Sequence, residues 1–123
     1  MPNVVVDLSS LRELDEYSMP GEPSLVVEIV GAYLEESEVD SKNLRDAVAS
    51  GDWAKLGNAA HRLKGSSANV GVKTVVELCA ALEKDAKRGP VANANARVNA
   101  ILEALAASCV ILERERAAAE QRG

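Results

Sequence analysis

The chain has 123 residues with a formal net charge of -5 at pH 7, and its composition is 47% hydrophobic and 2% aromatic, with no Phe. A chain of this length folds as one domain around one core, and we expect an acidic chain of this kind to have no nucleic acid partner. Because Leu, Val, Ile and Ala must build that core, the composition favours closely packed helices over a sheet.

The N-terminal segment, residues 1–7, has neither the basic residues nor the apolar length of a signal peptide. No run of the sequence approaches the roughly 20 apolar residues of a membrane span. We therefore expect a cytoplasmic protein with no membrane segment. Cys79 and Cys109 lie in phase with apolar neighbours, so buried reduced thiols are predicted instead of a disulfide. Two Cys and one His do not make a four-ligand zinc site, and we expect no metal.

A short first helix is predicted from Asp7 to Tyr17, where three leucines form a narrow apolar stripe. Either Asp7 or the pair Ser10 and Glu13 could cap its start, and Pro20 follows its end. We expect this helix to lie across one end of a bundle.

A longer second helix is predicted from Ser24 to Ser50. Its apolar positions keep a helical phase through the polar middle from Glu35 to Asn43, which favours one helix of about 40 Å. A bend is expected between Ser37 and Ser41, and Gly31 is the weak point. A break into two helices is the alternative that the pattern leaves open.

The third helix is predicted from Trp53 to about Val70. Gly51 suits the left-handed residue after a helix, Asp52 suits an N-cap, and Gly71 ends the element. At about 100° per residue, a core stripe occupies one face and His61 lies on the opposite, outward face. The stripe consists of Leu56, Ala60, Leu63, Ser67 and Val70.

His61 is the only histidine, and it lies in an acid-free window from Trp53 to Val76 that contains no Asp or Glu. Gly57 and Gly65 flank His61, and each glycine in a helix interior costs about 1 kcal/mol of helix stability relative to alanine. Their presence suggests that something large approaches the imidazole. An ordinary surface histidine on an amphipathic helix is the alternative interpretation. The neighbours of His61 on the helix surface are Gly57, Lys64, Gly65 and Ala68.

A fourth helix is predicted from Val72 to Arg88 and a fifth from Ala92 to Gln121, separated by Gly89-Pro90. Apolar residues become sparse after Leu112, so we expect a core over about residues 8–112 and a projecting or frayed end over residues 113–123. Short links favour antiparallel neighbours. The predicted fold is all-α: a single domain, residues 1–123, forming an antiparallel four-helix bundle with a short N-terminal cap helix.

The segment from Ala60 to Gly71 resembles the signature of histidine-containing phosphotransfer (HPt) domains. That signature is H-x-L-K-G-S followed by a small residue and, three positions later, an aliphatic residue and glycine. The resemblance extends from Leu8 to Leu112 and is tightest from Leu44 to Glu83. It implies the same bundle and a phosphorelay intermediate. Such a protein accepts a phosphoryl group on its histidine, here His61, from a receiver-domain aspartate and passes it to another receiver domain.

The resemblance also implies roles around His61, the phosphoacceptor. Lys64 is expected to neutralise the phosphoryl oxygens as a mobile point charge. Gly65, with Gly57 and Ala68, is expected to leave space for the receiver domain.

Further residues have two interpretations each. Arg62 and Lys55 either steer an acidic partner or are ordinary solvated charges. Glu83 either orients the imidazole ring, as an acidic or amide residue does in related domains, or is one more helix charge. We expect Ser66 and Ser67 to be small helix-contact residues whose hydroxyls bond back to the i−4 carbonyl, and phosphate ligands are the alternative.

The sequence has no Gly-rich phosphate loop, no Walker lysine motif and no acidic cluster near the histidine to hold Mg²⁺. We therefore expect a monomeric phosphotransfer protein and not an enzyme, with no cofactor of its own. The Mg²⁺ is expected on its partners, the receiver domains of a hybrid histidine kinase or of response regulators. The alternatives are a non-phosphorylatable helical module that docks receivers and a small helical enzyme of the chorismate mutase kind.

Overall fold

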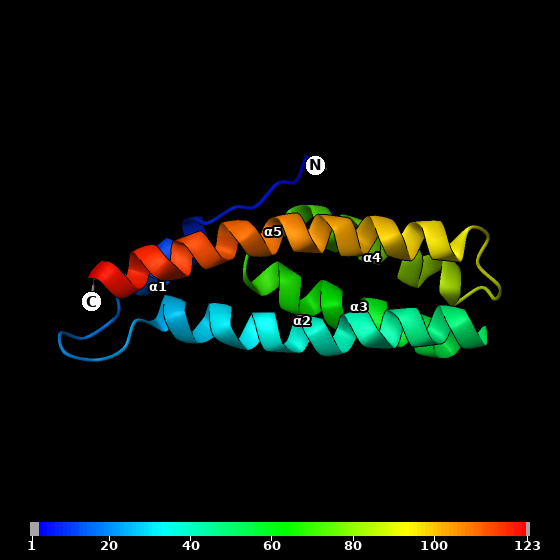
Figure 1. The fold of residues 1–123 in the computed structure, drawn as a ribbon, viewed down its shortest axis with the longest axis horizontal. Coiled ribbons are helices and arrows are strands. Elements are labelled where there is room, and N and C mark those ends of the chain that lie inside the picture. Colours follow the sequence, from blue (N-terminus) through cyan, green and yellow to red (C-terminus); the bar gives the residue numbers. More distant parts are fainter. Residues whose placement is uncertain (1–2, 123) are drawn as a thin grey trace.

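The computed structural model describes residues 3–122, over which the chain forms five α-helices and no β-strand. Helices α2 to α5 form an antiparallel bundle, and α1 lies beside one end of it (Figure 1). The predicted all-α bundle with a short N-terminal helix is confirmed. Met1, Pro2 and Gly123, the ends of the predicted domain, lie outside the described residues. The helices are α1 (Ser9–Asp15), α2 (Leu25–Ser50), α3 (Trp53–Asn69), α4 (Lys73–Ala86) and α5 (Ala94–Arg122).

Helix α2 is continuous over 26 residues, so the prediction of one helix is confirmed and the two-helix alternative is wrong. The hydroxyl of Ser24 caps its start by accepting a hydrogen bond from the backbone N–H of Val26 at 3.2 Å. The polar middle of α2 also packs against the other helices, and Ser37 and Asp40 in this stretch are buried. At 1.5 Å per residue, α2 is about 39 Å long.

The turn from α2 to α3 forms as its residues predict. Gly51 adopts φ 65° after the last residue of α2. The carboxylate of Asp52 then accepts a hydrogen bond from the backbone N–H of Lys55 at 3.0 Å and caps α3. These two residues make a sharp reversal, so α2 and α3 pack side by side and antiparallel.

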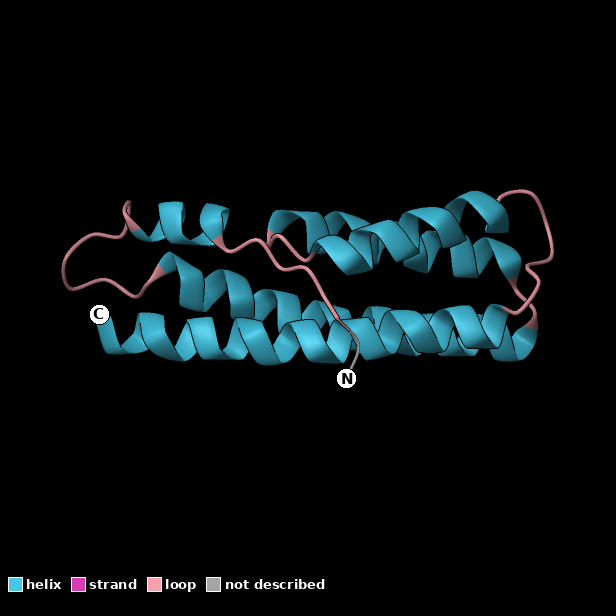
Figure 2. Ribbon diagram, turned by 90° about the horizontal axis from the view of Figure 1, so that it is seen from above, coloured by secondary structure: helices cyan, strands magenta, loops and turns pink. Residues whose placement is uncertain are grey.

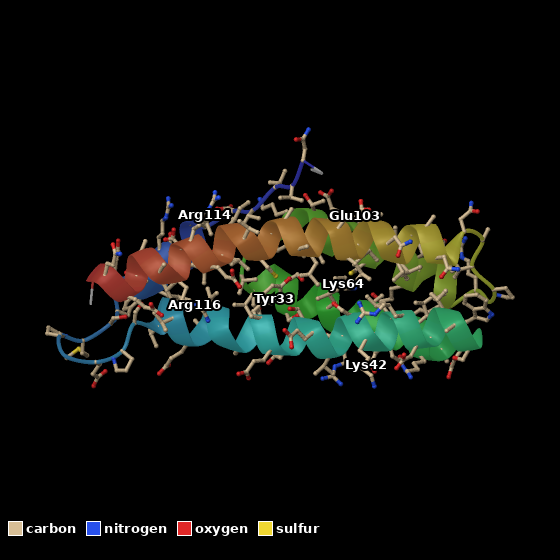
Figure 3. All side chains as sticks on the ribbon, in the orientation of Figure 1. Tyr33, Lys42, Lys64, Glu103, Arg114 and Arg116 are labelled. Atoms are coloured by element: carbon tan, nitrogen blue, oxygen red, sulfur yellow. The ribbon has the colours of Figure 1, made fainter. Side chains whose placement is uncertain are left out.

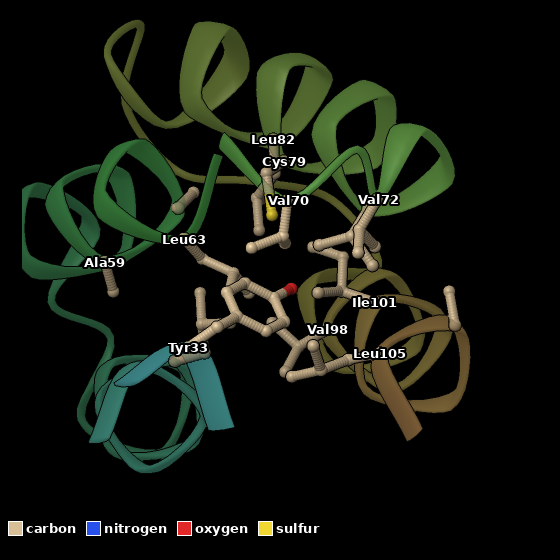
Figure 4. Close-up of a cluster of buried hydrophobic side chains, with 14 of the residues drawn as sticks. Tyr33, Ala59, Leu63, Val70, Val72, Cys79, Leu82, Val98, Ile101 and Leu105 are labelled. Carbon is tan, nitrogen blue, oxygen red and sulfur yellow. The ribbon is translucent and has the colours of Figure 1, made fainter. Parts of the chain in front are cut away.

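The core lies between α2, α3, α4 and α5 and is built from aliphatic side chains around Tyr33 (Figure 4). Both cysteines are free thiols. Cys79 is buried as predicted, whereas Cys109 is only half-buried. Burial raises the pKa of the Cys79 thiol to about 12. Charged side chains such as Lys42 and Glu103 point outward from the bundle (Figure 3).

The N-terminal segment runs over the link between α3 and α4 (Figure 2). The backbone N–H of Asp7 donates to the carbonyl of Gly71 at 2.8 Å, and that of Lys73 donates to the carbonyl of Val5 at 3.0 Å. Gly71 has φ 77°, and a Cβ atom there would overlap the carbonyl of Asp7. Gly71 therefore has two reasons to be glycine, its backbone angle and the close approach of this segment.

Helix α1 lies alongside the ends of α2 and α5 and not across the bundle (Figures 1 and 2). The guanidinium of Arg12 donates to the carboxylate of Glu115 at 3.2 Å. Glu115 and Ala119, the latter 1% exposed, are buried in this region. The expectation that residues after Leu112 bury little is therefore wrong, because α1 covers one face of this end of α5.

By length and composition, α5 is apolar enough to cross a membrane. The expectation that no segment approaches a membrane span is wrong by that measure. Length and composition alone are weak evidence, because the core helix of a water-soluble bundle has the same properties. Here α5 packs on α2 and α4 and contributes Val98, Ile101 and Leu112 to the core.

Candidate functional site

His61 lies in the middle of α3 on the face that points away from the core. Its side chain is 65% exposed, whereas every residue of the predicted α3 stripe is buried. Its Nδ1 atom lies 2.8 Å from Oε2 of Glu83 on α4. No described residue forms a hydrogen bond with the other ring nitrogen, Nε2, and this atom is therefore available to a reactant.

Glu83 connects the ring to two ammonium groups. Lys64 Nζ donates to Glu83 Oε1 at 2.6 Å, and Lys87 Nζ lies 3.3 Å from Glu83 Oε2. The Glu83 side chain is only 7% exposed. The hydrogen bond from Lys64, with those from His61 and Lys87, lowers the pKa of Glu83 to about 2, so this carboxylate stays ionised.

The ionised Glu83 selects the tautomer of His61. An ionised carboxylate only accepts hydrogen bonds, so the neutral ring must carry its proton on Nδ1 to bond with Glu83. The lone pair then lies on the exposed Nε2. The expected proximity of Glu83 to the ring is confirmed.

The small residues beside His61 divide into two groups. Gly65 and Ala68 are exposed, and nothing lies within 4 Å of a Cβ atom built on Gly65. Gly57 is buried instead, and a Cβ atom there would lie 3.5 Å from that of Ala86 on α4. The expectation that Gly57 leaves space for a partner is therefore wrong, because it lies in the packing of α3 against α4.

Two basic residues lie on the α2 side of His61. Arg62 Nε is 3.8 Å from Oδ1 of Asp40, a buried carboxylate of α2. Lys55, one of the residues expected to steer a partner, lies two turns earlier on α3 and is half-buried. Both line a groove between α2 and α3.

The two serines after Gly65 make different bonds. The hydroxyl of Ser66 donates to the carbonyl of Leu63 at 3.2 Å, so its bond goes back along the helix as expected but to the i−3 carbonyl instead of the i−4 carbonyl. The hydroxyl of Ser67 instead pairs with the hydroxyl of Tyr33 at 2.7 Å inside the core. Ser67 is thus a helix-contact residue as expected, but the expected bond to its own helix is wrong. This buried pair fixes the position of α3 relative to α2 below the site.

Lys87 and Asp40 are the two charged residues at the site that the sequence did not single out. The position of Lys87, four residues after Glu83, places both on the same face of a helix, and this spacing could have identified it. Asp40 also had a signal, because its position, three residues after Ser37 and four before Leu44, falls in the core phase of α2. Among the described residues, no group of three or more His, Cys, Asp or Glu side chains could hold a metal ion.

The fold agrees with comparisons to known proteins. The model of a family described as Hpt domain matches residues 28–116. Histidine-containing phosphotransfer protein 2 of Arabidopsis thaliana is 31% identical over 75 residues, or 58% of this chain and 48% of that protein. The chain thus spans about half the length of this curated relative.

A solved structure covers more of the chain. The crystal structure of histidine-containing phosphotransfer protein B from Pseudomonas aeruginosa PAO1 matches with a TM-score of 0.80 and 27% sequence identity. The match covers 96% of each chain.

Proposed function

The chain belongs to the Hpt domain family, and we propose that it is a phosphorelay intermediate of two-component signalling that carries its phosphoryl group on His61. The observation that carries this proposal is the hydrogen bond of 2.8 Å between Nδ1 of His61 and Glu83. In the neutral ring, this bond places the proton on Nδ1 and leaves the lone pair of the outward-facing Nε2 free to react.

The proposed reaction moves one phosphoryl group between an aspartate and His61. The Nε2 lone pair attacks the phosphorus of a receiver aspartyl phosphate, an N–P bond forms, and the P–O bond to the aspartate breaks. The aspartate leaves as a carboxylate. The phosphorylated ring retains its proton on Nδ1 and becomes cationic, and the ionised Glu83 stabilises that charge. Transfer to a second receiver is the same step in reverse.

Lys64 and Lys87 are the proposed partners of the phosphoryl oxygens. Phosphoryl transfer depends mainly on positioning and on neutralising oxygen charge. Both ammonium groups contact Glu83 at one edge of the imidazole, and a lysine is a mobile point charge with three donors. Each can therefore shift from Glu83 to a phosphoryl oxygen while Glu83 keeps its bond to the ring.

Gly65 and Ala68 are the proposed contact surface for the receiver beside His61. Both are exposed, and the space above Gly65 is open. The attacking nitrogen and the phosphorus must approach within about 3–3.5 Å. A large side chain at position 65 would therefore obstruct the receiver.

Proteins of this family are phosphotransfer carriers that interact with receiver domains, and we propose specific partners for this one. These are a receiver domain of a hybrid histidine kinase and one of a response regulator, and the receiver supplies the Mg²⁺. The protein itself works as a cytoplasmic monomer with no cofactor, and it binds neither ATP nor nucleic acid nor membranes.

The test is to incubate the protein with a receiver domain phosphorylated by acetyl phosphate, in the presence of Mg²⁺. We expect label on His61 that is lost in acid and retained in alkali. The variant His61→Gln should take up no label, and ATP without a receiver should not label the wild-type protein.

Label that persists in His61→Gln would contradict the proposal. Binding of phosphorylated receivers without any transfer of label would instead support the module that only docks receivers.

A further inference from the structure

Asp40 is a buried carboxylate in the middle of α2. It is 3% exposed, and its Oδ1 atom has no hydrogen-bond partner among the described residues. Burial raises the pKa of Asp40, an effect that Arg62 opposes and Glu36 reinforces. A buried carboxylate without full hydrogen bonding is costly, so stability alone gives no reason for this residue.

The guanidinium of Arg62 is the basic group paired with this carboxylate. Arg62 Nε lies 3.8 Å from Asp40 Oδ1, yet the Arg62 side chain remains 70% exposed. Attraction to a charge in a low-dielectric interior is stronger than attraction to a surface charge. Asp40 therefore restrains Arg62 through its Nε side. The four N–H groups on Nη1 and Nη2 have no hydrogen-bond partner among the described residues.

The restrained guanidinium lies beside His61 but on the side opposite to Glu83. Consecutive residues on a helix are about 100° apart, so Arg62 faces α2 while Lys64 faces α4. There Arg62 lines a groove of about 470 Å³ together with Lys55 and Asn58 of α3 and Asn43 of α2. A protein surface that covers His61 and Gly65 would also meet the edge of this groove.

We infer that Asp40 is a positioning residue that holds the guanidinium of Arg62 at the edge of the α2–α3 groove, where it binds an acidic side chain of the docked receiver domain. This inference rests on the proposed function and adds a specificity-determining contact to it. A planar guanidinium held in one orientation can bind a carboxylate with two parallel hydrogen bonds, whereas an unrestrained one loses conformational entropy on binding. The pair therefore acts on docking and leaves the chemistry at Nε2 unchanged.

The experiment separates docking from transfer by steady-state kinetics. The probe is a receiver domain, phosphorylated with acetyl phosphate, that labels the wild-type protein. Initial rates over a range of protein concentrations give KM and kcat. We expect Asp40→Asn to raise KM about three- to tenfold and to leave kcat within about twofold, because it removes the charge that orients Arg62. Glu36→Gln is the matched control. It removes an exposed carboxylate one turn away on α2, and its KM should equal that of wild type.

Coupling between the two residues gives the second part of the test. Arg62→Gln should raise KM as much as Asp40→Asn does, and the double variant should be no worse than Arg62→Gln alone. Arg62→Lys keeps the charge but lacks the Nε–H group, so it should also raise KM. Asp40→Asn should melt at or above the wild-type temperature, since it removes a buried charge.

Three results would overturn the inference. The first is a wild-type KM for Asp40→Asn, and the second is a KM in the double variant that equals the product of the two single fold-increases. The third is a fall in both kcat and melting temperature for Asp40→Asn. If Asp40→Asn does not fold, Arg62→Lys decides the question, and a wild-type KM for that variant overturns the inference. The proposed function fails separately, because in that case the wild-type protein itself takes up no label.

Discussion

At the residue scale, Glu83 controls the chemistry available at His61 because its two oxygens bind three donors. Oε2 fixes the tautomer of the ring and lies near Lys87, while Oε1 binds Lys64. Removing this carboxylate would release the ring and both ammonium groups at once. The effects of replacing Glu83 should therefore exceed those of breaking one surface salt bridge.

The first prediction concerns acid stability. Glu83 has a folded-state pKa of about 2, below its ordinary value of 4.5. A carboxyl group with a lowered folded-state pKa stabilises the protein fully above the unfolded value, and this contribution is lost as the pH falls toward the folded value. Wild type should lose it between about pH 4.5 and about pH 2, and Glu83→Gln should lose less free energy of unfolding over that range.

Urea unfolding at about pH 6 and about pH 3 measures this difference. Glu77→Gln is the control, because Glu77 is an exposed carboxylate on the same helix, and its acid loss should match that of wild type. Equal losses in Glu83→Gln and wild type would show that Glu83 contributes nothing to acid stability.

The second prediction concerns Gly65. Replacing it with Ala should stabilise α3 by up to about 1 kcal/mol, because nothing lies near the new Cβ atom. Gly65→Gln should also fold normally, yet it should transfer phosphoryl groups slowly because its side chain obstructs the receiver. Thermal melts and receiver-to-His61 transfer rates test both variants. Wild-type transfer by Gly65→Gln would mean that the receiver does not approach this face.

At the element scale, helix ends and buried faces were predictable because they depend on local chemistry. Gly51 and Asp52 mark the α2–α3 reversal by themselves, and the α3 stripe follows from a period of 3.6 residues. What each face meets was not predictable, because the partner comes from another helix. Gly57 of α3 packs against Ala86 of α4, and Ser67 of α3 bonds to Tyr33 of α2. The periodicity of α3 alone predicts neither contact.

The third prediction compares two glycines with left-handed backbones. Gly51 has φ 65° and Gly71 has φ 77°, so alanine costs about 1–2 kcal/mol at either position from backbone strain alone. At Gly71 the new Cβ atom would also overlap the carbonyl of Asp7, whereas the space at Gly51 is open. Gly71→Ala should therefore lose more free energy of unfolding than Gly51→Ala, and urea titrations compare them. Equal losses would contradict the close packing of the N-terminal segment on Gly71.

At the scale of the whole molecule, the site is less cationic than its sequence suggests. The acid-free window from Trp53 to Val76 holds no carboxylate in sequence, but α4 brings Glu83 to Lys64, and α2 brings Asp40 toward Arg62. The sequence identified the histidine and its basic neighbours because they share one helix. Of the two carboxylates brought from other helices, Glu83 was named only through the resemblance to HPt domains, and Asp40 was not named at all.

The fourth prediction is that receiver binding weakens with salt. The protein has a net charge of -5, yet Lys55, Arg62 and Lys87 surround the exposed face near His61. Salt screens attraction between such exposed charges and an acidic partner. The dissociation constant should rise between about 50 mM and about 300 mM NaCl, and Lys55→Gln should reduce the dependence. A constant affinity over this range would indicate an apolar docking surface.

The most direct test of the central claim is nuclear magnetic resonance of the ¹⁵N-labelled protein after phosphorylation by a receiver domain. The chain has one histidine, so every imidazole signal belongs to His61. We predict phosphorus bonded to Nε2, a proton retained on Nδ1, and loss of the N–P coupling when an unphosphorylated receiver and Mg²⁺ are added. Phosphorus on Nδ1, or a phosphoryl group that does not leave in the presence of that receiver, would contradict the account.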